Sequence, residues 1–175
     1  MTINEMIKKY NITMVVQNGQ EMISARPYKK PTQAECEAIK AAKPEILAEI
    51  KRQKAEEKAA YEARQAKINA IEGLGIIRKA IDAEENFRAS FNRAMENGSC
   101  LYPSQPKESS TELKKEYPRA AAYLKAEAYE HASNYAKRAA GKKAKERIIN
   151  GEDYTKVLAD MEAEWTKAAQ ESIWN

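Results

Sequence analysis

The chain has 175 residues, of which 32% are charged, with a mean hydropathy of -0.76 and a net charge of +4. This length suits one domain or two small modules, and the composition is typical of a water-soluble, helix-rich protein. No apolar run reaches the roughly 18 residues of a membrane-spanning helix, so none is expected.

Residues that usually hold metals and cofactors are scarce. Cys36 and Cys100 cannot form a disulfide framework, and the N-terminus lacks a secretory signal, so we expect reduced thiols in a cytoplasmic protein. His131 is the single histidine, which leaves too few ligands for a structural zinc site. No glycine-rich phosphate-binding motif occurs, and we expect neither a metal nor a cofactor.

The N-terminal segment is the only part of the chain that predicts β structure. Thr2 and Glu5 form a capping box for a short first helix. Asn18-Gly19 then predicts a two-residue type I′ turn, which pairs Gln17 with Gln20 and fixes the register of the whole hairpin.

The register sorts the hairpin side chains onto two faces. Val15 and Met22 lie in the middle of a mixed face that also carries Thr13, Ser24, Gln17 and Gln20. The opposite face is apolar and requires a helical cover, because a lone hairpin is marginally stable. It collects Ile12, Met14, Val16, Ile23 and Ala25.

Helical signals follow the hairpin. Thr32 and Glu35 predict a second capping box, for a helix with Ala34, Ala38 and Ile39 directed inward. Lys43-Pro44 ends that helix and starts another, whose later part loses its apolar side and is expected to be a solvated connector.

Gly73-Leu74-Gly75 predicts a helix break and the best domain boundary. An amphipathic helix then runs to Asn97-Gly98, followed by a loop in which Ser109 and Glu112 predict a cap. Pro118 starts a longer helix that ends at Asn150-Gly151, whole or broken at Gly141. Its expected buried stripe is Ala121, Leu124, Ala128, Ala132 and Tyr135. The last helix has an apolar stripe from Tyr154 to Ala169.

The predicted fold class is therefore mainly α, with an N-terminal helix–β-hairpin–helix module followed by a long helix and a C-terminal helical bundle. We predict three parts: a module over residues 1–52, a connecting helix over 53–72 and a bundle over 73–175.

The N-terminal segment from Ile7 to Lys51 resembles the docking domain found at the N-terminus of TubC, a natural-product synthetase component. The resemblance lies in the order of helix, Asn-Gly hairpin, Pro31-Thr32 and Lys43-Pro44-Glu45, and it covers somewhat over a quarter of the chain. It implies a small α/β module that receives an acidic peptide along an exposed strand. The implied partner-binding residues are Gln20, Met22, Ser24, Arg26, Lys29 and Lys30.

A second basic region lies in the C-terminal half, where residues 112–150 carry ten basic and five acidic groups. Its densest cluster is Lys137, Arg138, Lys142, Lys143, Lys145 and Arg147. This cluster can follow a nucleic-acid backbone, and it can equally be a solvated helix face or a partner for the acidic tail. Both interpretations are open at this point.

Signals for catalysis are weak. No nucleophile motif surrounds His131, whose expected place is a polar surface or a hydrogen-bonded core site. Asp160 and Glu164 share a helix face while Glu162 points away from it, which makes a poor metal site. A metal-dependent nuclease built from dispersed carboxylates is one alternative that the sequence leaves open.

We expect no enzyme and no membrane partner. The leading hypothesis is an interaction protein that docks on a protein or ribonucleoprotein complex. No condensation or carrier domain follows the N-terminal segment, and small chains of this kind resemble accessory proteins of phages and mobile elements. That resemblance implies an anti-CRISPR inhibitor of an RNA-guided nuclease. A basic nucleic-acid-binding accessory protein is a further alternative.

Overall fold

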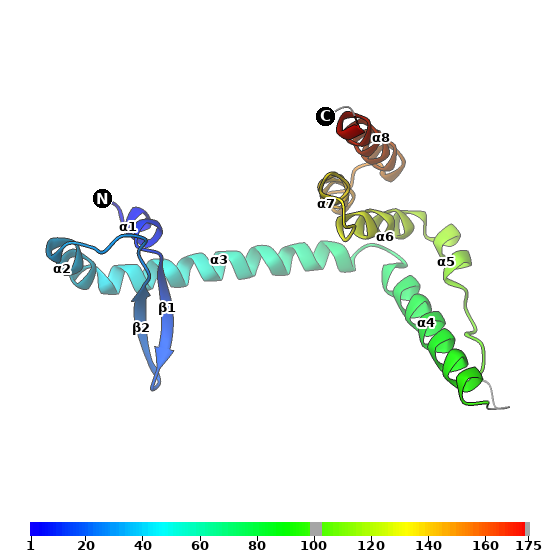
Figure 1. Cartoon of the computed structure of the whole chain (residues 1–175), viewed down its shortest axis with the longest axis horizontal. Helices are drawn as coiled ribbons and strands as arrows, with labels where there is room; N and C mark the ends of the chain where they lie inside the picture. Colours follow the sequence, from blue (N-terminus) through cyan, green and yellow to red (C-terminus); the bar gives the residue numbers. More distant parts are fainter. Residues whose placement is uncertain (99–102, 174–175) are drawn as a thin grey trace. The chain divides into compact units, whose positions relative to one another are not determined.

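The computed structural model describes residues 1–98 and 103–173. It confirms the fold class: an N-terminal helix–β-hairpin–helix module, a long helix and a C-terminal helical bundle (Figure 1). The chain divides into two compact units, Met1–Ala63 and Arg64–Asn175. The three-part division made from the sequence stays a prediction. Cys100 lies outside the described residues, and Cys36 is a half-buried free thiol.

The N-terminal unit is built from α1 (Ile3–Lys9), β1 (Ile12–Gln17), β2 (Gln20–Ala25), α2 (Gln33–Ala41) and the first turns of α3 (Lys43–Asn69). Both predicted capping boxes form. The Glu5 carboxylate accepts a hydrogen bond from the Thr2 N–H at 2.7 Å, and Glu35 accepts one from the Thr32 N–H at 2.8 Å. Pro44 lies in the first turn of α3, where a backbone N–H would have no hydrogen-bond partner within the helix, so the missing N–H of proline costs nothing.

The hairpin turn has the predicted conformation. Asn18 and Gly19 have φ values of 51° and 75°, the left-handed region that a type I′ turn requires at both positions. The strands pair in the predicted register, from Gln17 opposite Gln20 to Ile12 opposite Ala25.

The N-terminal core forms where the hairpin lies across the first turns of α3 (Figure 1). Val16 belongs to the apolar face but is 66% exposed, because it lies near the turn, where the hairpin extends past the helix. Ala34 and Ala38, predicted to point inward, are exposed too, and α2 contributes only Ile39. Burial of each isoleucine contributes about 1.5–3 kcal/mol, which stabilises a hairpin that is marginal alone. The buried set is Tyr10, Ile12, Ile39, Ile46 and Ile50.

Most of α3 between Lys51 and Ala63 is exposed, as predicted for a solvated helix. Ile68 and Ile71, beyond that stretch, are buried in the C-terminal core. The end of α3 therefore belongs to the C-terminal unit, ahead of the helix break that the structure confirms at Gly73.

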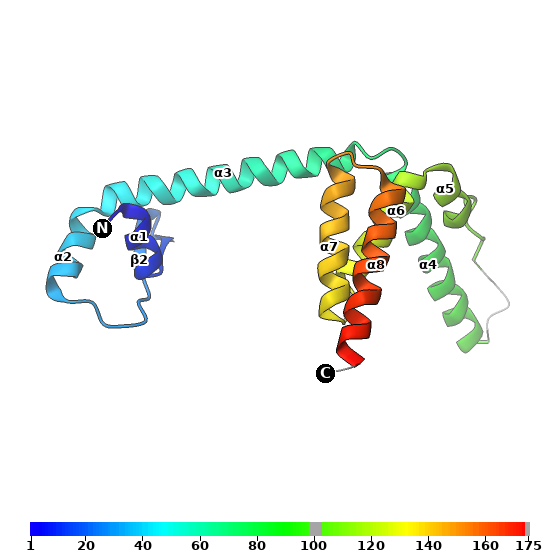
Figure 2. The same cartoon turned by 90° about the horizontal axis from the view of Figure 1, so that it is seen from above.

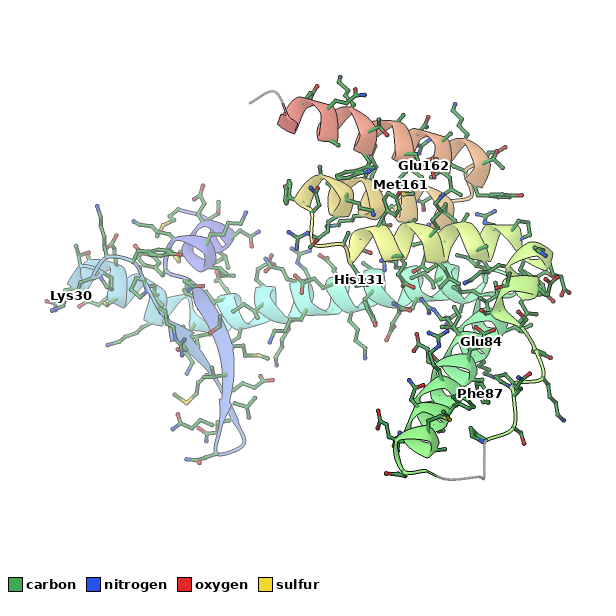
Figure 3. The ribbon with its side chains drawn as sticks, turned by 45° about the vertical axis from the view of Figure 1, so that its right-hand side comes forward. Lys30, Glu84, Phe87, His131, Met161 and Glu162 are labelled. Carbon is green, nitrogen blue, oxygen red and sulfur yellow. The ribbon has the colours of Figure 1, made fainter. Side chains whose placement is uncertain are left out.

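The C-terminal unit adds five helices: α4 (Leu74–Glu96), α5 (Ser110–Glu116), α6 (Pro118–Glu130), α7 (Tyr135–Ile149) and α8 (Tyr154–Ile173). Figure 2 shows α7 and α8 side by side, and α6 packs against both. The predicted stripe of α8 is confirmed, since Val157 and Met161 are almost fully buried and Met161 lies on the side of α8 toward α7 (Figure 3).

The helix predicted from Pro118 has the predicted end at Asn150, but it is neither whole nor broken at Gly141, and both of these alternatives are wrong. The helix ends at Glu130, and Asn134 caps a new helix by accepting a hydrogen bond from the Lys137 N–H at 3.1 Å. The predicted stripe is also wrong: its members are half-buried or exposed, and Tyr135 is 79% exposed. The buried face of α6 consists instead of Ala120, Ala122, Tyr123 and Ala126.

The predicted cap of α5 is replaced by a tertiary one. Ser109 makes no side-chain cap. Glu84 of α4 accepts hydrogen bonds from the backbone N–H and the hydroxyl of Ser110, each at 2.7 Å (Figure 3). These bonds hold the pKa of Glu84 below its usual range and fasten α5 to α4.

Gly141 lies in the middle of α7, at a place where the backbone of α6 is very near. A Cβ at this position would lie 2.4 Å from the Glu130 backbone nitrogen and 2.7 Å from the Ala126 carbonyl oxygen. Because both neighbours are backbone atoms, neither can turn away. The glycine therefore sets how tightly α6 and α7 pack.

We predict that Gly141→Ala destabilises the C-terminal unit by about 1–3 kcal/mol, since α6 and α7 must separate to admit the methyl group. Gly75→Ala is the matched control. Gly75 is also helical but has nothing within 4 Å of a built Cβ, so alanine should stabilise by about 0.4–1 kcal/mol. Calorimetric unfolding of both variants checks this, and equal stabilities would contradict the close packing.

Candidate functional site

The outer edge of β2 is free among the described residues. The sheet contains only β1 and β2, and α1 packs against β1. The Arg26 N–H donates across the hairpin to the Asn11 carbonyl at 3.4 Å. Since hydrogen-bonded and non-hydrogen-bonded pairs alternate in an antiparallel ladder, the backbone groups of Glu21, Ile23 and Ala25 face away from β1.

The backbone groups of the predicted residues Gln20, Met22 and Ser24 face toward β1 and not outward. Their backbone groups belong to the pairs bonded to β1, and their side chains lie on the mixed face. On that face Met22 is 37% exposed opposite Val15, which is 39% exposed. The residues with outward-facing backbone groups lie within the predicted strand edge, Gln20–Arg26, but they were not named individually, although the Asn18-Gly19 turn fixes their phase.

The chain leaves β2 through a basic loop of residues 26–31. The Arg26 backbone N–H is held by the Tyr10 carbonyl at 3.1 Å, and its side chain is exposed. Lys29 and Lys30 are exposed as well, and Figure 3 shows Lys30 at the edge of the N-terminal unit. Within the described part of the chain, none of these three cations has a carboxylate partner. Tyr28 between them is 96% exposed.

A hollow of about 400 Å³ lies beside this loop, lined by Lys9, Tyr10, Tyr28, Lys29, Lys30, Pro31 and Glu35. Lys9 forms an ion pair with Glu35 at 2.9 Å. Lys29 and Lys30 therefore provide the positive charge of the hollow that no carboxylate compensates. Glu35, in the first turn of α2, forms part of the wall of the hollow.

Glu35 is the most strongly shifted acid beside the loop. The nearby Tyr10 hydroxyl, the Thr32 backbone N–H and the Lys9 ammonium lower the pKa of Glu35 to about 2. In return, the Glu35 carboxylate raises the pKa of Tyr10. The Tyr10 hydroxyl is buried and has no hydrogen-bond partner among the described residues, so it acts on Glu35 through proximity and not through an aligned hydrogen bond. The contacts of Glu35 with Lys9 and Thr32 thus link α2 to α1 and to the end of the loop.

The predicted nucleic-acid-binding cluster on α7 is not one continuous basic face. Lys143 pairs with Glu164, and Arg147 pairs with Glu152 at 2.7 Å and Asp160 at 2.9 Å. The acidic C-terminal segment thus supplies partners for the cluster, as one of the two interpretations expected.

The remaining members of the cluster differ from one another. Lys145 is almost buried and pairs with Glu130. Lys137 lies over the Tyr129 ring, with 4.4 Å between its nitrogen and the ring centre. Arg138 and Lys142 are exposed, and neither has an ion-pair partner in the described residues. Nucleic-acid binding by all six stays a prediction.

The carboxylates considered for metal binding point to different cations. Asp160 and Glu164 reach Arg147 and Lys143 of α7, whereas Glu162 reaches Lys125 of α6, as their helical spacing predicted. Among the residues that the structure describes, no three His, Cys, Asp or Glu side chains gather around a common point. No described helix is long and apolar enough to span a membrane.

His131 ends α6 and is exposed, in agreement with a polar surface site. It lines a groove of about 630 Å³ together with apolar residues that include Ile81, Leu124 and Ala128. The alanine stripe predicted for the core therefore contributes to this open groove. Among the described residues that line it there is no serine, threonine or cysteine.

We predict that Glu35→Gln makes the stability of the protein depend less on pH between about 4.5 and 2. The folded pKa of Glu35 is about 2, below an unfolded value near 4.5, so its contribution is present above pH 4.5 and is lost as the pH falls toward 2. The difference in melting temperature between wild type and variant should shrink across that window. Glu37→Gln in the same helix is the control, and a constant difference for Glu35→Gln would contradict the assignment.

Comparison with known proteins adds no relative: no family model, curated protein or solved structure matches the chain significantly.

Proposed function

We propose that this chain is a non-catalytic interaction protein whose N-terminal unit holds an extended acidic segment of a partner along β2. The observation that carries the proposal is the outward-facing backbone of Glu21, Ile23 and Ala25 beside a basic loop whose cations have no acidic partner in the described residues. Strand addition uses such an edge: backbone hydrogen bonds provide affinity, and neighbouring side chains select the sequence.

The charges beside this edge determine which end of a bound strand would be acidic and which strands would be preferred. Arg26, Lys29 and Lys30 follow the end of β2, so acidic residues of an incoming strand would lie at that end. Exposed charges of this kind speed association and select partners more than they add affinity, and salt weakens them. An added third strand would also give the two-stranded sheet the size at which sheets become stable.

The resemblance to the TubC docking domain favours the same mode of binding. The partner that we propose is a host protein or ribonucleoprotein complex. Within that class the narrower proposal is inhibition of an RNA-guided nuclease, as an anti-CRISPR protein of a phage or mobile element. This narrower step rests on analogy with small accessory proteins.

A peptide titration tests the docking mode. We predict that an unstructured peptide of alternating glutamate and valine shifts the amide NMR signals of Glu21, Ile23 and Ala25 in the full chain. The double variant Lys29→Glu/Lys30→Glu should bind about tenfold more weakly, a loss of about 1.4 kcal/mol.

Lys43→Glu/Lys54→Glu makes the same charge change at exposed positions of the N-terminal unit and serves as the control. If both double variants bound the peptide equally weakly, the loss of affinity would come from net charge and not from the basic loop. Binding without shifts in β2 would place the peptide elsewhere and overturn strand addition.

A cleavage assay tests the narrower proposal. We predict that the purified chain reduces DNA cleavage by an RNA-guided nuclease from a bacterial host, and that Lys29→Glu/Lys30→Glu restores cleavage. Undiminished cleavage would remove the inhibitor proposal and leave peptide docking in place. Incubation of the chain alone with DNA, RNA and Mg²⁺ is the companion measurement, and cleavage products there would contradict the non-catalytic assignment.

A further inference from the structure

Ion pairing within the C-terminal unit singles out two cations of α7. Lys143, Lys145 and Arg147 are held by carboxylates, and Lys137 lies over the Tyr129 and Trp165 rings. Arg138 and Lys142 remain, both exposed and without an acidic partner in the described residues. A cation that keeps its full hydration and charge is available to an external anion, whereas a paired one is largely neutralised.

An exposed aromatic ring lies on the same side of α7 as these two cations. Tyr135, Arg138 and Lys142 have the i, i+3, i+7 spacing that places residues on one helix face. Tyr135 is 79% exposed, which makes it the most exposed large hydrophobic residue described in the C-terminal unit. With a rise of about 1.5 Å per residue, Arg138 and Lys142 are separated by roughly 6 Å along the helix.

These three side chains border a shallow hollow of about 340 Å³, together with Glu130 and Ala139. Glu130 is the one carboxylate in this lining, and its charge is engaged by Lys145. The hollow therefore offers a flat apolar ring at one end and two uncompensated cations farther along the helix.

From this arrangement we infer a binding site for single-stranded nucleic acid on α7. A base stacks on the Tyr135 ring, and the phosphates that follow it contact Arg138 and Lys142. Proteins that bind single strands combine aromatic stacking with cations that follow the backbone. A duplex keeps its bases stacked on one another, so the exposed ring favours an unpaired strand. An acidic protein segment would use the cations alone and leave Tyr135 without a role.

The inferred site lies in the C-terminal unit and does not depend on peptide docking at β2. It also narrows the basic cluster predicted from the sequence, because four of its six members are already engaged within the chain.

Fluorescence anisotropy of the full chain with labelled dT15 and U15 at several salt concentrations tests the inference. We predict binding that weakens with salt. Tyr135→Ala should lower the affinity about tenfold, and Tyr135→Phe, which keeps the ring, should not. Lys142→Gln should reduce the slope of log affinity against log salt by about 0.7.

Lys143→Gln is the matched control, a neighbouring lysine on the same helix whose charge is taken by Glu164. It should leave the affinity and the slope unchanged. Equal effects of Lys142→Gln and Lys143→Gln, or no binding of either oligonucleotide, would overturn the inference. A 15-residue polyglutamate that binds as tightly as dT15 and ignores Tyr135→Ala would assign the face to an acidic protein segment instead. Melting temperatures of the four variants exclude misfolding as the cause.

Discussion

The two-residue turn at Asn18-Gly19 is the constraint on which the N-terminal surface depends. Because the turn admits one register, it decides which side chains meet α3 and which backbone groups face outward. A shift by one residue would turn Ile12, Met14 and Ile23 away from the core and exchange the free backbone groups of β2. Core, edge and proposed docking mode therefore follow from one local conformation.

The C-terminal unit is organised by close approach and by charge. Gly141 lets the backbones of α6 and α7 meet, and the carboxylates of α8 pair with the basic side of α7. Exposed ion pairs stabilise little individually, typically less than about 1 kcal/mol each. Their larger effect here is to compensate the charges of Lys143 and Arg147, whereas Arg138 and Lys142 have no acidic partner in the described residues.

Local signals in the sequence were sufficient for the N-terminal unit. The capping residues Thr2 and Thr32 and the turn at Gly19 act within four residues of themselves, so their structure could be predicted and was confirmed. The phase of the ladder also followed from the turn. What the sequence could not predict there was the extent of burial, because periodicity alone does not show whether another element covers a side chain. Val16 and Ala38 have the right periodicity and are nevertheless exposed.

Non-local contacts account for the errors in the C-terminal unit. Helix α6 carries alanine on several faces, so a search for apolar periodicity cannot distinguish the face of Ala121 from that of Ala122, and packing chose the latter. The cap of α5 comes from Glu84, which lies 26 residues before Ser110. Ion pairs such as Lys143 with Glu164 likewise join residues whose separation carries no signal in one sequence.

The basic loop at the end of β2 has a consequence for the chain's own behaviour. A free strand edge is also a template for pairing with an identical edge, the usual beginning of aggregation. If two such edges paired in parallel, the two basic loops would lie side by side, and repulsion between like charges opposes that arrangement. If they paired in antiparallel fashion, each basic loop would instead lie beside the partner's turn, where Glu21 is already paired with Lys51. The side chains that would recognise an acidic strand therefore disfavour one of the two ways in which the protein can pair with itself.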